Sequence, residues 1–203
     1  MEKLISIGRP VAGLVLAAGE SRRMGCPKLL LPWHGDTILG CTLANAIAGG
    51  INPLTVVCGA HAAQVAAQAK TKGLPCLFNE GYAQGQSASL ICGLKAAPPG
   101  YGLMFILGDM PAVSPQSYKS LAVAYAKSDA LIVAPINAEG RRGNPTVWAP
   151  QLFPEIARLF GDSGARGLLD KYREETLFLP LTEQGLYIDI DTPEDYEGKL
   201  CGC

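Results

Sequence analysis

Short apolar runs alternate along the chain with segments in which apolar residues recur at helical spacing. One helix can be capped by Asp36 and run to about Ala48, a second opens at Ser114–Pro115 and reaches about Lys127, and a third begins near Ser87. The apolar runs predict strands over residues 11–16, 54–58, 74–78, 103–107, 130–134, 176–181 and 186–190.

This alternation predicts an α/β fold built on a single doubly wound, mostly parallel sheet with helices on both faces. Such sheets bind ligands beyond the carboxyl ends of their strands. Residues 135–150 break the alternation, because they are rich in Gly, Asn and Arg before a possible strand at 146–149. They predict a small inserted hairpin or a lid over the site. With 203 residues and no repeat or linker, we expect one domain spanning 1–203.

Composition narrows the possible partners. Lys plus Arg is 17 and Asp plus Glu is 18, which leaves a net charge of -1 and no overall attraction to nucleic acid or to an anionic membrane. No apolar run reaches the roughly 20 residues of a membrane-spanning helix. Residues 1–19 loosely resemble a secretion signal, but Arg9 and Pro10 split the apolar segment, which favours the strand at 11–16.

The seven cysteines are an odd number without paired C-x-x-C spacing, which favours a reducing cytoplasm over a disulfide framework or a zinc site. Cys58, Cys76 and Cys92 are expected to be small core residues. Cys201 and Cys203 form either a frayed thiol-bearing tail or a soft-metal ligand pair.

The loop after the first expected strand, residues 17–28, combines small residues with Arg22, Arg23 and Lys28. Small residues let the backbone approach a ligand, and the basic side chains supply charge, so the loop suits a polyphosphate. The alternative is a solvated basic turn. The spacing from Gly19 to Gly25 does not fit a Walker A loop, and no dinucleotide-binding G-x-G-x-x-G follows the strand.

Acidic residues follow two of the expected strands. Asp109 comes directly after the most apolar one and would lie beside the first loop if the two strands are neighbours; the alternative is a plain turn. A hard cation such as Mg2+ takes one or two carboxylates together with substrate phosphates. Asp189 and Asp191 lie two apart on the last expected strand and so share a face. Asp191 also precedes Thr192–Pro193, so it is alternatively a helix N-cap.

The segment Leu16-Ala-Ala-Gly-Glu-Ser-Arg-Arg-Met-Gly-Cys-Pro-Lys28 resembles the L-A-[AG]-G-x-S-x-R-M-G-x-x-K signature of the MobA-like nucleotidyltransferases. Within that family the chain looks closest to the molybdenum cofactor cytidylyltransferases. The matching segments extend over nearly the whole chain and include residues 85–90, 107–113, 142–145, 161–166 and 189–195.

The resemblance implies transfer of CMP from CTP to the terminal phosphate of molybdopterin, with release of pyrophosphate and Mg2+ as cofactor. It implies catalytic roles for Arg23, Lys28 and Asp109, and metal binding by Asp109 and Asp191. The residues implied in nucleotide binding are Leu16, Ala17, Ala18, Gly19, Gly25, Lys28, Asn79, Gly85 and Ser87.

Two further expectations concern the substrates. Family members that use GTP usually carry Gly where this chain has Ala18, so its β-carbon favours CTP over a purine nucleotide. Arg141, Arg142 and Asn144 form a donor group suited to the phosphate and pterin of the acceptor. Asp162 and Arg166 either assist them or form a salt bridge that caps a helix.

Three other functions remain open at this stage: transfer from GTP to molybdopterin, transfer to another phosphorylated acceptor such as a sugar phosphate, and non-catalytic carriage of the finished cofactor. A molybdoenzyme or a chaperone would receive the product.

Overall fold

The computed structural model describes residues 8–162 and 164–200. Within these residues seven strands form one sheet in the order β5-β4-β1-β6-β8-β7-β9, in which β8 is antiparallel to both neighbours and the other pairs are parallel. The expected α/β fold with a mostly parallel sheet is therefore confirmed. The strands are β1 (Val11–Ala17), β4 (Leu54–Cys58), β5 (Cys76–Phe78), β6 (Gly102–Leu107), β7 (Ile132–Ile136), β8 (Thr146–Trp148) and β9 (Thr176–Pro180), and β2 (Pro32–Trp33) pairs with β3 (Asp36–Thr37) in a separate ribbon.

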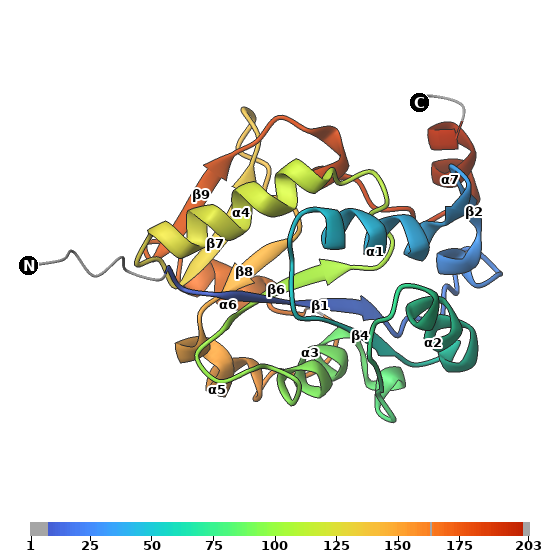
Figure 1. The fold of residues 1–203 in the computed structure, drawn as a ribbon, viewed down its shortest axis with the longest axis horizontal. Helices are drawn as coiled ribbons and strands as arrows, with labels where there is room; N and C mark the ends of the chain where they lie inside the picture. The colour runs from blue at the N-terminus through green and yellow to red at the C-terminus, as the bar shows by residue number, and fades with distance from the viewer. Residues whose placement is uncertain (1–7, 163, 201–203) are drawn as a thin grey trace, which may run out of the picture.

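Helices cover both faces of the sheet, and Figure 1 shows α1 and α4 on one side with α3 and α5 on the other. The helices are α1 (Ile38–Ala48), α2 (Ala62–Thr71), α3 (Gln86–Leu94), α4 (Pro115–Lys127), α5 (Phe153–Ile156), α6 (Arg166–Lys171) and α7 (Pro193–Leu200). Short 3-10 turns occur at Lys28–Leu30, Tyr82–Gln84, Pro150–Leu152 and Gln184–Tyr187.

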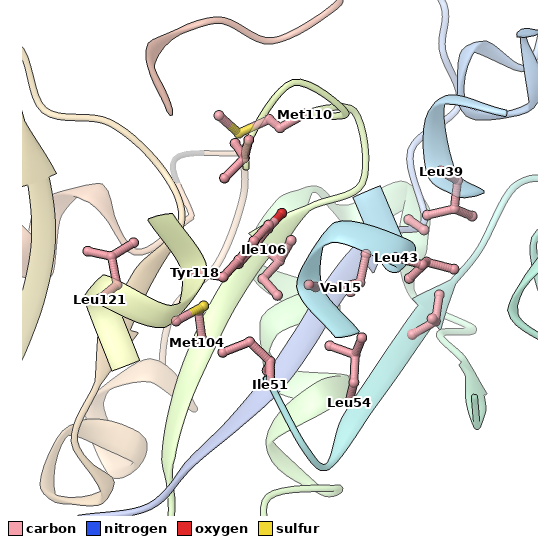
Figure 2. Close-up of a cluster of buried hydrophobic side chains, with 14 of the residues drawn as sticks. Val15, Leu39, Leu43, Ile51, Leu54, Met104, Ile106, Met110, Tyr118 and Leu121 are labelled. Carbon is pink, nitrogen blue, oxygen red and sulfur yellow. The ribbon is translucent and has the colours of Figure 1, made fainter. Parts of the chain in front are cut away.

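The central strands are buried on both faces, as the near-continuous apolar sequence of β1 requires. Successive residues of β1 face opposite cores: Val15 packs with the residues of α1 and α4, and Leu14 packs with those of α3 and α5. Figure 2 shows the first of these cores, where Leu43 of α1 and Tyr118 of α4 meet Ile106 of β6. Full burial of such a side chain contributes about 1.5 to 3 kcal/mol, so this packing holds the carboxyl ends of β1 and β6 in place.

The segment 135–150 forms the expected hairpin. Its second strand, β8, is inserted into the sheet between β6 and β7, with Val147 paired to both Met104 and Val133. An isolated bridge between Ile136 and Arg142 extends the pairing beyond the regular strands. The hairpin is thus part of the sheet, and its far end brings residues 142–144 to the side of the molecule where β6 ends.

Two local predictions are wrong. Residues 186–190 do not form a strand, because Gln184–Tyr187 makes a 3-10 turn in which Leu186 and Tyr187 are both buried. A short buried apolar run does not by itself distinguish a strand from a turn of helix. Asp36 does not cap α1, since the hydroxyl of Thr37 accepts the hydrogen bond from the Gly40 amide. Asp36 instead accepts hydrogen bonds from Gln68 and Lys72.

The apolar segment near the N-terminus forms β1 from Val11 onward, which agrees with the strand interpretation of that region. Across the described ranges no helix is both long and apolar enough to cross a membrane. Cys58 is buried and Cys76 and Cys92 are partly buried, as expected for core residues. The predictions for Cys201 and Cys203 lie outside the described residues.

Candidate active site

A cleft of about 500 Å3 opens at the carboxyl ends of β1 and β6. These strands are parallel neighbours, and Figure 1 shows both arrowheads pointing toward the end of the molecule that carries α7. The loop after β1 forms one wall, through Ala18, Gly19, Arg23 and Lys28. Asp109 was expected beside this loop if the two strands are neighbours, and the pairing of β1 with β6 meets that condition.

The loop after β1 is held by its own backbone and by one buried side chain. Ser21 adopts a left-handed conformation with φ 54°, its carbonyl accepts a hydrogen bond from Met24 N, and its hydroxyl accepts one from Lys28 N at 3.2 Å. Met24 is 9% exposed and anchors the loop to the protein. A Cβ added at Gly19 would meet no atom within 4 Å, so the backbone there is open to a ligand.

Four charged side chains from three distant parts of the chain converge in the cleft. Lys28 Nζ donates to Asp109 Oδ2 at 2.5 Å, to Asp191 Oδ1 at 2.9 Å and to the carbonyl of Ile190 at 2.8 Å. Arg23 Nη2 donates to the other oxygen of Asp191 at 2.8 Å. All three predicted catalytic residues and both predicted metal ligands therefore lie in one hydrogen-bonded group.

Burial and charge move the pKa values of this group in different directions. Burial raises the pKa of Asp109, although the Lys28 ammonium acts against it. Burial acts in the same direction on Asp191, but Lys28 and Arg23 outweigh it and leave the pKa of Asp191 lowered. Burial would lower the pKa of Lys28, but the carboxylates of Asp109 and Asp191 outweigh it and leave that pKa raised. The lysine therefore stays cationic at neutral pH.

The position of Asp191 differs from both sequence interpretations. It lies in the connection before α7 rather than on a strand, so it does not share a strand face with Asp189. The N-cap of α7 is Thr192, whose hydroxyl accepts from Asp195 N at 3.2 Å while Asp195 Oδ2 accepts from Thr192 N at 3.0 Å. Asp191 is thus directed into the cleft by this turn and binds Lys28 and Arg23 there.

The donor set fits a hard divalent cation. Asp109 and Asp191 present carboxylate oxygens to a single point, now taken by Lys28 Nζ, and Mg2+ requires only one or two carboxylates when phosphates supply further ligands. No cluster of three or more His, Cys, Asp or Glu side chains able to hold a metal ion occurs within residues 8–162 and 164–200. The convergence of the two carboxylates suits an ion that is bound together with a phosphate ligand.

Some residues of the predicted nucleotide set do not line the cleft. Leu16 and Gly85 do line it, as do Ala18, Gly19 and Lys28. Ala17 and Ser87 are buried behind it, and Gly25 lies at a turn of the first loop with φ 67°. Asn79 donates to Ser89 Oγ at 3.1 Å and accepts from Gly81 N at 3.0 Å, so it supports Ser89, which does line the cleft.

A second cavity of about 270 Å3 adjoins the first and shares Leu16, Gln86, Leu107 and Asp189 with it. Its lining mixes polar side chains, among them Arg142 and Asn144, with apolar ones that include Phe105 and Trp148, whose rings stack at 5.8 Å between centroids. Arg142 forms an ion pair with Asp170 at 2.6 Å. Arg141, predicted with the same group, is exposed and lines neither cavity.

The sequence interpretation missed Tyr82, which lines the first cleft, and it included Gln86 only as the middle of the 85–87 turn expected to bind the nucleotide. Gln86 is the first residue of α3 and lines both cavities. The glycine at position 85 was the available sequence signal for the cleft position of Gln86. Glycine tolerates the positive φ of 103° with which the chain turns sharply into α3. Asp162 and Arg166 line the first and the second cavity respectively, so they face different spaces.

Residues 13–176 match the family model described as the MobA-like NTP transferase domain. The chain belongs to this family. The match includes the loop after β1 and Asp109, while Asp189 and Asp191 lie beyond its end.

Relatives of the family carry several different names. The chain is 29% identical to the nicotine blue oxidoreductase of Paenarthrobacter nicotinovorans over 190 residues, which is 91% of this chain and 93% of that protein. It is 29% identical to the molybdenum cofactor cytidylyltransferase of Escherichia coli K12, over 90% of this chain and 92% of that one. A probable molybdenum cofactor guanylyltransferase of Rhodopirellula baltica is 32% identical over 92% of this chain and 90% of its own length.

The fold has solved counterparts. A crystal structure of Rv0371c from Mycobacterium tuberculosis H37Rv matches with a TM-score of 0.84 at 32% identity, over 96% of this chain and 99% of that one. A complex of that protein with manganese matches with a TM-score of 0.80 at 30% identity, over 96% and 100% of the two chains. The MobA-like fold of this chain therefore extends over nearly its full length, and a structural relative of it binds a divalent metal ion.

Proposed function

We propose that the protein transfers CMP from CTP to the terminal phosphate of a molybdopterin-type acceptor and releases pyrophosphate. The observation that carries the proposal is the junction of two cavities. One contains the basic loop and the group formed by Arg23, Lys28, Asp109 and Asp191; the other contains Arg142 and Asn144. A nucleotide in the first and a phosphorylated heterocycle in the second would bring their phosphates together where the cavities meet.

The reaction needs no protein nucleophile. An oxygen of the acceptor phosphate attacks the α-phosphorus of CTP, the bond from that phosphorus to the bridging oxygen breaks, and the electron pair leaves with pyrophosphate. Catalysis of this kind depends on positioning and on charge stabilisation. Lys28 and Arg23 would neutralise charge on the triphosphate, while the backbone around Gly19 would lie against it.

Asp109 and Asp191 would hold Mg2+, which when bound would neutralise charge on the phosphates. The convergence of their oxygens and the manganese complex of a structural relative support this assignment. The molybdopterin acceptor is supported by the Arg142 cavity, because its lining combines two aromatic residues, Phe105 and Trp148, with the guanidinium of Arg142, which suits a flat heterocycle with a phosphate.

The test is pyrophosphate release by the purified protein with molybdopterin and MgCl2, supplied with CTP or GTP in parallel. Release with CTP, together with a cytidine-bearing product detected by mass spectrometry, supports the proposal. Release with GTP alone would indicate a guanylyltransferase. A protein that binds the finished cofactor but releases no pyrophosphate with either nucleotide would be a carrier. Release only in a parallel assay, in which a sugar phosphate replaces molybdopterin, would indicate a different acceptor.

The choice of base provides a prediction about Ala18. This residue is 5% exposed at the cleft wall, and its carbonyl accepts a hydrogen bond from Ala60 N at 3.3 Å, so its β-carbon is held in position. Differences in pocket shape of this size are worth about 1 to 3 kcal/mol, so kcat/KM for CTP should exceed that for GTP by roughly tenfold to a few hundredfold. The Ala18→Gly variant should narrow this ratio.

Ala60→Gly is the matched control, because the Ala60 amide donates a hydrogen bond to the Ala18 carbonyl while Ala60 lines neither cavity. It should leave the ratio unchanged. Equal kcat/KM for CTP and GTP in the unmodified protein would rule out the proposed role of the Ala18 β-carbon.

Arg142 provides a prediction about the acceptor. If its guanidinium binds the acceptor, Arg142→Ala should raise the KM for molybdopterin about tenfold or more and leave the KM for CTP nearly unchanged. Steady-state kinetics with each substrate varied in turn measures both constants. Arg158→Ala, which removes an exposed arginine outside both cavities, serves as the control. A raised KM for CTP with unchanged molybdopterin binding would instead place this loop over the nucleotide.

A further inference from the structure

Lys28 occupies the point at which the two cleft carboxylates converge. Its ammonium lies 2.5 Å from Asp109 Oδ2, 2.9 Å from Asp191 Oδ1 and 2.8 Å from the Ile190 carbonyl, and its side chain is only 15% exposed. An ammonium has three N–H donors, and the three oxygens match that number. Lys28 therefore binds as a cation enclosed by oxygen acceptors.

Arg23 completes the neutralisation of this group. Asp191 Oδ2 accepts from Arg23 Nη2 at 2.8 Å, so both oxygens of Asp191 already bind cationic side chains. A divalent ion that coordinates both Asp109 and Asp191 must therefore break at least one charge-assisted hydrogen bond. A bound ion and the Lys28 ammonium at one point would also repel each other strongly.

We propose that Lys28 is a resident cation in the metal site, which a divalent ion displaces only when a triphosphate accepts the lysine. This inference rests on the proposed function, because the same lysine would bind the two carboxylates before the nucleotide binds and the triphosphate of the nucleotide afterwards. Nucleotide-free protein should then bind divalent metal weakly, and metal and nucleotide should bind cooperatively. The arrangement couples occupancy of the metal site to the presence of the nucleotide.

The first test measures Mn2+ binding to the nucleotide-free protein by electron paramagnetic resonance of the free ion. Lys28→Met keeps the length of the side chain and removes its charge. It should tighten Mn2+ binding by about ten- to a hundredfold, because the ion no longer has to break hydrogen bonds between charged groups. Lys28→Gln should tighten binding in the same direction.

Lys72→Met is the matched control. Lys72 Nζ also binds a carboxylate, Asp36 Oδ2 at 2.7 Å, and is partly buried, but it lies outside the cleft. Its removal should leave Mn2+ binding unchanged. Unchanged affinity in both Lys28 variants would overturn the proposal, because the ion would then not compete with the lysine for the carboxylates.

A second measurement needs no variant and so does not depend on the folding of one. The amines of the unmodified protein are acylated with acetic anhydride, and the modified lysines are quantified by mass spectrometry. With Mg2+ alone, Lys28 should stay protected by its carboxylates. With the non-hydrolysable α,β-methylene analogue of CTP, Mn2+ affinity measured by electron paramagnetic resonance should rise, while Lys72 labelling stays constant. Release of Lys28 by millimolar Mg2+ alone would contradict the coupling.

Failure of this inference is distinguishable from failure of the proposed function. If every variant binds Mn2+ tightly without nucleotide and the protein still releases pyrophosphate from CTP and molybdopterin, the proposed transferase function holds. Only the proposal that Lys28 is a resident cation then fails. If Lys28→Met tightens Mn2+ binding but the unmodified protein releases no pyrophosphate, the resident-cation proposal holds. The proposed reaction then fails.

Discussion

Asp109→Ala should abolish most of the turnover while leaving the fold intact. Asp109 follows β6, lines the cleft and binds Lys28 at 2.5 Å, so its loss removes a metal ligand and a partner of the catalytic lysine. Losing one preorganised electrostatic group of this kind lowers kcat by about a hundred- to a thousandfold, and losing the ion as well increases the loss. The measurement is pyrophosphate release with CTP, molybdopterin and saturating Mg2+.

The fold should survive because the backbone hydrogen bonds of Gly108 and Asp109 to neighbouring segments remain when the Asp109 side chain is removed. The Asp109 carbonyl accepts a hydrogen bond from Ile190 N at 3.4 Å, and the preceding Gly108 N donates to the Leu16 carbonyl at 3.0 Å. Asp109→Asn keeps the shape of the side chain and should lose nearly as much activity, since it lacks the charge.

Asp36→Ala is the control for Asp109→Ala. Asp36 is also an aspartate paired with a lysine, but it lies in the β3 segment outside the cleft. It should retain nearly full turnover. Near-normal pyrophosphate release by Asp109→Ala with Mg2+ present would refute the metal assignment.

The parts of the site that could be predicted from sequence follow from strand ends. Lys28 and Asp109 each follow a strand of a parallel sheet, and parallel strands end at one edge, so both were expected at the same side of the molecule. Their direct contact depends on β1 and β6 being neighbours, and strand order is a property of the packed sheet. The two residues are 81 positions apart in the sequence, and nothing in the intervening segment signals that adjacency locally.

Asp191 shows why the remainder of the site was harder to predict. The apolar pattern of residues 186–190 is compatible with a strand, but these residues follow the edge strand β9 and must return to the ends of β1 and β6. They do so through a tight turn, in which Gly185 packs so closely against Ala112 that a Cβ there would lie 2.3 Å from its carbonyl oxygen. The tertiary path therefore overrides the local pattern, and it brings Asp191 to Lys28.

The residues that the family motifs predicted for nucleotide binding fall into two groups: some line the cleft, and others lie near it without facing it. Ala18, Gly19 and Gly85 line the cleft because backbone close to a strand end or a helix start is exposed there. Asn79 belongs to the same neighbourhood, but its side chain turns toward Ser89 and Gly81. A motif places a residue near a site, whereas the direction of its side chain depends on hydrogen bonds that the motif does not specify.

Lys28→Ala should lower kcat and kcat/KM for CTP together, by about a hundred- to a thousandfold. In the free protein the ammonium is bound by Asp109 and Asp191, so moving it to the ground-state triphosphate exchanges one set of charged partners for another. Little net CTP affinity is gained by this exchange. In the transition state, negative charge develops on the α-phosphate and on the departing pyrophosphate. The attraction of the Lys28 ammonium to that charge has no equivalent in the free protein.

Pre-steady-state kinetics separates the two contributions, because a single turnover of bound CTP reports the chemical step. In Lys28→Ala that step should slow by the same factor as kcat, while CTP binding measured without acceptor changes by only a few-fold. Lys72→Ala, which removes a partly buried lysine–aspartate pair outside the cleft, should change neither quantity. A variant with unchanged single-turnover rate and a strongly raised KM for CTP would show that Lys28 contributes to substrate binding alone, because its interaction would then be equally strong in the ground state and in the transition state.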